Sequence, residues 1–89
     1  MDLSRVLVRS AEVLEASVDG DRVLMSGRDF AYFGLVDTGA VVWDRIDGHT
    51  SLGELVRALA ADFGADEAVV ARDVAEFVSA LDAAGLLEA

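Results

Sequence analysis

The chain has 89 residues, no cysteine, a formal net charge of −10 and 54% hydrophobic residues. This composition predicts one folded domain over residues 1–89 and excludes disulfides and thiolate chemistry. The acidic balance disfavours nucleic-acid binding, because carboxylates repel phosphates. No apolar run approaches the roughly 18 residues of a bilayer span, and the N-terminus lacks a signal-peptide pattern. We therefore expect no membrane association and a cytoplasmic location.

Three stretches in the first part of the chain have β-strand patterns: residues 13–18, 22–26 and 30–36. Glycine-containing turns separate them, which predicts an antiparallel meander. The third stretch reads F-A-Y-F-G-L-V and is apolar on both faces, although one face of a small meander normally meets water. Two explanations are open. Either a helix covers one face and the N-terminal residues cover the other, or one face or edge is left for a partner strand.

A short helix is predicted next. Asp37 can cap its first turn. Val42, Trp43 and Ile46 give it an apolar side, and Gly48 is expected to end it in a left-handed conformation. Trp43 is the only tryptophan, and we interpret it as a core anchor.

Two further helices follow, each with a clear start signal. Ser51 and Glu54 form a capping-box pattern before a helix that reaches about residue 63. Asp66 caps the last and longest helix, which runs to about residue 84 and stops at Gly85. Each helix has one apolar stripe, which is typical of packing against a core. The stripes are Leu52, Leu55, Val56, Leu59 and Phe63 in the first, and Val70, Val74, Phe77, Val78 and Leu81 in the second.

The order of three strands and then three helices predicts an α+β fold. Two short helices followed by a longer one are typical of a helix-turn-helix unit, and the preceding three-stranded antiparallel sheet makes it a winged helix-turn-helix. Leu86 and Leu87 are expected to fold back onto the core. An exposed strand edge also invites self-pairing, so a homodimer is an alternative to the monomer.

No residue pattern indicates catalysis. The only histidine, His49, has no second histidine or cysteine to complete a zinc site, and the carboxylates are scattered. We therefore predict a protein that is not an enzyme and uses no metal or cofactor. Thr50-Ser51-Leu52 loosely resembles the Asp-Ser-Leu site of acyl carrier proteins, so a carrier with phosphopantetheine on Ser51 is one alternative. A winged-helix DNA-binding protein is another, although Arg72 is the only basic residue of its recognition helix.

Residues 35–55 read L-V-D-T-G-A-V-V-W-D-R-I-D-G-H-T-S-L-G-E-L, and the chain continues with D-V-x-x-F-V-x-x-L and G-L-L. In this order and spacing the motifs resemble the PqqD-like family, over about residues 12–87. The family pattern is L-x-x-T-G-A-x-x-W, D-G, T/S-L-x-E-L, D-V-x-x-F-V/L-x-x-L and G-L-L. Val36 stands where the family often has Asn, so the helix cap moves to Asp37.

The resemblance implies a winged helix-turn-helix that recognises the leader segment of a ribosomally synthesised precursor peptide. Such domains present the leader to modifying enzymes. A free-standing chain most resembles the leader-binding protein of lasso-peptide biosynthesis, which works with a leader peptidase. The peptide chaperone of a radical-SAM system is an alternative.

The resemblance also implies a binding mode, in which the leader adds a strand beside the third strand and over the last helix. The implied peptide-binding residues are Phe30, Ala31, Tyr32, Phe33, Gly34 and Leu35 on the strand, and Val69, Arg72, Asp73 and Glu76 on the helix. Arg72 could pair with a leader carboxylate, and Asp73 or Glu76 with a basic or hydroxyl side chain. Phe33 is also a candidate for the core, and Asp73 for a bond to Arg72 or to a backbone amide.

Overall fold

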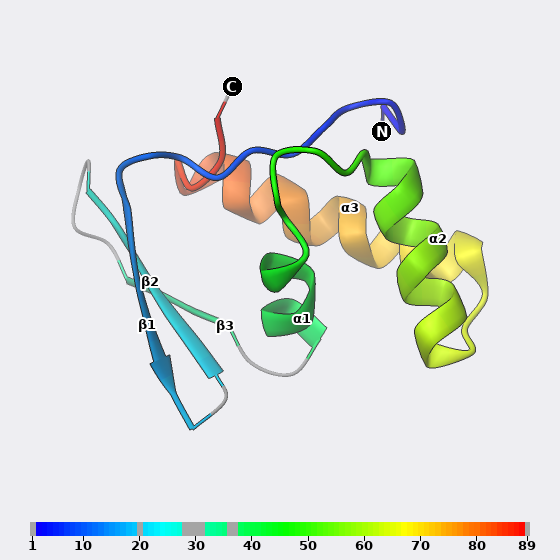
Figure 1. The fold of residues 1–89 in the computed structure, drawn as a ribbon, viewed down its shortest axis with the longest axis horizontal. Coiled ribbons are helices and arrows are strands. Elements are labelled where there is room, and N and C mark those ends of the chain that lie inside the picture. The colour runs from blue at the N-terminus through cyan, green and yellow to red at the C-terminus, as the bar shows by residue number, and fades with distance from the viewer. Residues whose placement is uncertain (1, 20, 28–31, 36–37, 89) are drawn as a thin grey trace.

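The computed structural model describes residues 2–19, 21–27, 32–35 and 38–88. Figure 1 shows a three-stranded antiparallel sheet followed by three helices. The strands are β1 (Val13–Val18), β2 (Asp21–Ser26) and β3 (Tyr32–Leu35), in the order β1-β2-β3. The helices are α1 (Thr38–Asp44), α2 (Leu52–Phe63) and α3 (Glu67–Ala83). This order confirms the predicted α+β fold with its winged helix-turn-helix arrangement. None of the described helices is long and apolar enough to cross a membrane.

The sheet has a buried inner face and an exposed outer face. Directly paired residues of antiparallel strands share a face. Leu24 pairs with Phe33 on the inner face, where Leu24 and Leu35 are buried and Phe33 is half-buried. Met25 pairs with Tyr32 on the outer face, where Tyr32 is 76% exposed. The sheet therefore contributes only its inner face to the hydrophobic core.

Trp43 is the largest side chain of that core and is fully buried. The guanidinium of Arg9 lies over its ring, 4.6 Å from the centroid. Arg9 also donates a hydrogen bond of 2.6 Å from Nη2 to the Trp43 carbonyl oxygen. Within the described residues the indole N–H has no hydrogen-bond partner. Packing and the cation–π contact therefore hold this side chain in place, as expected for a core anchor.

Helix α1 ends at Asp44, earlier than its apolar pattern predicts. The amides of Arg45 and Ile46 donate to carbonyls three residues back, which tightens the last turn and stops the helix. Ile46 is nevertheless buried, and Gly48 does adopt a positive φ of 81°. The predicted cap Asp37 lies outside the described residues.

The ends of α2 and α3 follow the local signals of the sequence. Ser51 and Glu54 form the complete capping box at the start of α2. The Asp66 carboxylate accepts from two amides at the start of α3. Gly64 and Gly85 both have positive φ, and the amide of Leu86 donates to the Leu81 carbonyl beyond Gly85. That bond satisfies a terminal carbonyl of α3 and turns the chain back toward the core.

The N-terminal arm (residues 2–10) runs along the helices, as Figure 1 shows. The first two amides of α2, from Leu52 and Gly53, donate to the carbonyls of Arg5 and Leu3. The arm therefore satisfies donors that a helix N-terminus otherwise leaves to solvent.

The other end of the arm pairs with the C-terminal segment. The amide of Ser10 donates to the Leu86 carbonyl, and the amide of Glu88 donates to the Val8 carbonyl. Leu7, which directly precedes these contacts along the arm, is buried. One of the two explanations for the apolar third strand had the N-terminal residues covering one of its faces. The outer face is open instead, with Tyr32 76% exposed, while the backbone of the arm is held by α2 and by the C-terminal segment.

The arm is also fixed to α3 by an ion pair, which makes stability depend on pH. Arg5 donates two bonds of 2.9 Å to the carboxylate of Asp82. These bonds hold the pKa of Asp82 below its ordinary value of 3.8. Because folding lowers this pKa, the stabilisation is present above the ordinary value and is lost as the pH falls through the folded-state value.

Asp82→Asn is therefore expected to destabilise the protein most at neutral pH. The loss should be below about 1 kcal/mol, because the pair is partly exposed. Urea unfolding at about pH 7 and about pH 2 provides the measurement, and the gap between wild type and variant should shrink in acid. A gap of the same size at both pH values would contradict the role of the ion pair.

Candidate functional site

Strand β3 forms one edge of the sheet. It pairs with β2 on one side, and no other strand of the described residues pairs with it. Alternate residues of such a strand direct their N–H and C=O groups outward, so an edge is a template for another extended chain. The leading sequence expectation placed a peptide at this strand.

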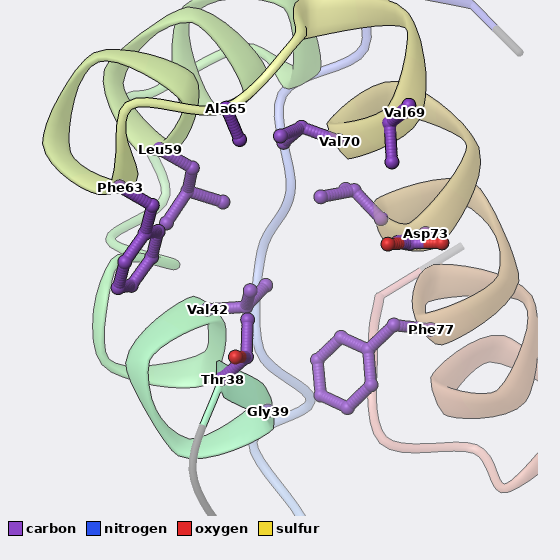
Figure 2. Close-up of a pocket in the computed structure, with 11 residues that line it drawn as sticks. Thr38, Gly39, Val42, Leu59, Phe63, Ala65, Val69, Val70, Asp73 and Phe77 are labelled. Carbon is purple, nitrogen blue, oxygen red and sulfur yellow. The ribbon is translucent and has the colours of Figure 1, made fainter.

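A cavity of about 370 Å³ opens between the three helices. This volume lies in the range of ligand clefts, roughly 300–1,000 Å³. Figure 2 shows side chains from α1, α2 and α3 converging on it. The lining residues are Thr38, Gly39, Val42, Leu59, Phe63, Ala65, Val69, Val70, Asp73, Val74 and Phe77.

The lining is almost entirely apolar. Asp73 is the only charged residue among the eleven. Phe63 and Val69 are 54% and 45% exposed, so each presents apolar surface to solvent. Apolar surface gathered in a concave site favours an apolar ligand group, while the Asp73 carboxylate and the Thr38 hydroxyl can accept from an N–H or O–H donor.

Gly39 connects this cavity to the end of β3. A Cβ atom at this position would lie 3.4 Å from Cε1 of Phe77 and 3.9 Å from Cδ2 of Leu35. Leu35 is the last residue of β3, and Phe77 lines the cavity. The Leu35 side chain at the end of β3 therefore lies next to the cavity.

The structure distributes the predicted strand residues over different environments. Tyr32 and Gly34 are exposed on the outer face of the sheet, Phe33 is half-buried on the inner face, and Leu35 is 2% exposed. Leu35 can therefore contribute backbone groups but almost no side-chain surface. Phe30 and Ala31 lie outside the described residues. Their predicted roles in peptide binding stay predictions.

Two of the four predicted helix residues, Val69 and Asp73, line the cavity. Arg72 and Glu76 are exposed on α3 but do not line it.

The sequence interpretation missed Phe63 and Phe77 as site residues by assigning both to core stripes. Phe63 is more than half exposed, so its assignment to the core is wrong, and Phe77 is half-buried. The available signal was the position of Phe63, which is the last residue of its stripe and directly precedes the helix-breaking Gly64.

The residues considered for other chemistry have structural roles. The Ser51 hydroxyl accepts from the Glu54 amide at 3.2 Å and donates to the Glu54 carboxylate at 3.0 Å. Asp47 accepts from the amides of His49 and Thr50, and these bonds lower its pKa. The described residues contain no cluster of three or more His, Asp or Glu side chains that could hold a metal ion.

Two solved structures have closely similar folds. One is described as TbiB1 in complex with the TbiA(beta) leader peptide. It is 32% identical, covers 91% of this chain and 94% of its own, and has a TM-score of 0.83. The other is described as lasso peptide synthetase B1 complexed with the leader peptide. It is 25% identical, covers 96% of this chain and 100% of its own, and has a TM-score of 0.84. Among proteins with curated descriptions, none matches this sequence.

The family model described as coenzyme PQQ synthesis protein D matches residues 21–87. The match spans β2, β3 and all three helices, and it includes every lining residue of the cavity. It confirms the resemblance seen in the sequence motifs. This chain therefore belongs to the PqqD family.

Proposed function

We propose that this chain binds the leader segment of a ribosomally synthesised precursor peptide and presents it to the enzymes that process the peptide. One observation carries the proposal. The fold of this chain is similar, over more than nine-tenths of its length, to those of two proteins solved with leader peptides. The protein is itself non-catalytic in this role, and it works in the lasso-peptide type of pathway.

The leader pairs with the open edge of β3 as an additional strand. Backbone pairing of this kind gives attraction with little sequence preference. Each hydrogen bond contributes about 0.5–1.5 kcal/mol net, and β3 has only four described residues. Ordering a disordered leader costs about 2–5 kcal/mol, so pairing alone leaves little surplus.

The apolar cavity supplies the rest of the affinity. A leader residue that follows the β3 segment places its side chain among Val69, Val70 and Phe77, where apolar surface leaves water. Asp73 accepts a hydrogen bond from a donor on that side chain or beside it. The site therefore selects a leader residue with an apolar side chain that carries a hydrogen-bond donor at its end or is followed by a residue that has one.

Titration with a fluorescent leader peptide tests this function. The peptide is taken from the precursor gene beside the gene for this chain, and fluorescence anisotropy should show saturable one-site binding. A scrambled leader of identical composition is the matched control, because it keeps charge and hydrophobicity but loses the order of anchors. Equal binding of both peptides, or no saturation with the native leader, contradicts the proposal.

A further inference from the structure

The outer face of the sheet is largely apolar. The strand register places Leu14, Met25 and Tyr32 in one row across the three strands, and Ala16, Val23 and Gly34 in the next. Val18 follows on the same face of β1. A shallow hollow of about 160 Å³ on this face is lined by Leu14, Glu15, Ala16, Val23, Met25 and Tyr32.

This surface is open to solvent. The exposed fractions are 59% for Leu14, 53% for Val18 and 76% for Tyr32. The solvent face of an antiparallel sheet is normally polar, so hydrophobic side chains gathered there need another explanation. None of these three side chains belongs to the core. A contiguous apolar patch of this kind is typical of a protein interaction site.

Among the residues that the structure describes, three acidic side chains border this outer face. Glu12 is exposed just before β1, Asp19 is exposed at the other end of that strand, and Asp21 pairs with Val18 on the same face. The two described arginines nearest to the sheet, Arg9 and Arg22, make contacts on its inner side. Arg9 contacts Trp43 and Glu15, while Arg22 pairs with Asp44. A second copy of this chain is a poor occupant, because each copy carries a net charge of −10 and the same acidic border.

We propose that the outer face docks the enzyme that processes the precursor, through an apolar enzyme surface bordered by arginine or lysine. This inference rests on the proposed leader-binding function. The cavity lies among the helices and is lined by none of the outer-face residues. Tyr32 belongs to β3, whose edge pairs with the leader, but Leu14 and Val18 lie on β1 at the opposite edge of the sheet. The chain can therefore hold a leader at β3 and an enzyme on the β1 side at the same time.

Two glutamate substitutions distinguish a specific effect of this surface on enzyme binding from a general effect of added negative charge. Leu14→Glu inserts a carboxylate into the β1 part of the patch. Leu3→Glu is the matched control on the N-terminal arm, where Leu3 is 52% exposed. The probe is the purified leader peptidase encoded beside the precursor gene, tested by biolayer interferometry against the immobilised chain saturated with leader. Leu14→Glu should weaken peptidase binding at least about tenfold, while Leu3→Glu should leave it unchanged. Both variants should keep wild-type leader affinity and melting temperature.

A charge-only substitution tests the acidic border. Asn tolerates the positive φ of 51° at position 19, so Asp19→Asn removes the charge and keeps the turn. It should slow association with the peptidase about two- to threefold at low salt, with a smaller effect at high salt.

Three results would overturn the proposal. One is equal peptidase binding by wild type and Leu14→Glu. Another is no peptidase binding by a chain that holds its leader normally, which would leave the leader-binding function standing. The third is a wild-type dimer in sedimentation analysis that Leu14→Glu converts to a monomer, because the face would then be occupied by a second copy.

Discussion

Replacing Val69 with glutamate is expected to weaken leader binding at least about tenfold. Val69 is 45% exposed in the free protein and lines the apolar cavity. A bound leader would cover this position, so a carboxylate there would lose water without gaining a partner. Fluorescence anisotropy with the labelled leader provides the measurement.

The fold should tolerate this change. Val69 is the third residue of α3, beside the cap formed by Asp66. A carboxylate in the first turn interacts favourably with the helix dipole. The melting temperature should therefore be unchanged or slightly higher, and a loss of leader binding cannot be attributed to unfolding.

Val8→Glu is the matched control for Val69→Glu, since Val8 is 42% exposed and lies on the N-terminal arm. Both variants have the same net charge. Repeating the titrations at about 1 M salt, where the Debye length is about 3 Å, removes long-range repulsion. Equal affinities for the two variants would show that the cavity is not part of the leader site.

Trp43→Ala is expected to lower the free energy of unfolding by about 3–5 kcal/mol. The side chain is fully buried at the centre of the core, and its removal also takes away the ring under Arg9. Small domains have only about 5–15 kcal/mol of stability in total, so much of the variant could be unfolded at 37 °C. Urea unfolding measures the loss. It is followed by far-UV circular dichroism, because the variant has no tryptophan whose fluorescence could report unfolding.

Trp43→Phe distinguishes packing from hydrogen bonding in this prediction. The indole N–H has no partner within the described residues, so phenylalanine gives up volume but no hydrogen bond. Its cost should be clearly smaller than that of alanine. Equal losses of stability in the two variants would contradict this prediction, because they would show that the indole nitrogen matters more than the packing of the ring.

The sequence predicts the helix ends well because their signals are local. The Ser51–Glu54 box and the turns at Gly64 and Gly85 each depend on a few neighbouring residues, and all three form as expected. The apolar pattern of α1 continues to Ile46 and predicts a later end than the structure has. An apolar pattern indicates which side chains are buried. A residue such as Ile46 can be buried without belonging to the helix.

The cavity and the open sheet face could not be predicted in the same way. A stripe such as the one ending at Phe63 indicates which side of a helix is apolar, but not whether another element covers all of it. At β3 both faces are apolar, so alternation gives no information on which face is inward. The register with β2 determines which face of β3 is inward, because it places Phe33 opposite the buried Leu24.

The pairing of the N-terminal arm with residues 86–88 has a consequence for biosynthesis. During translation the arm leaves the ribosome first, but the carbonyl and amide that fix its far end belong to Leu86 and Glu88. The hairpin of β1 and β2 needs only local contacts and can form early. The hydrogen bonds that fix the far end of the arm can therefore form only after residues 86–88 have emerged, so the arm docks late.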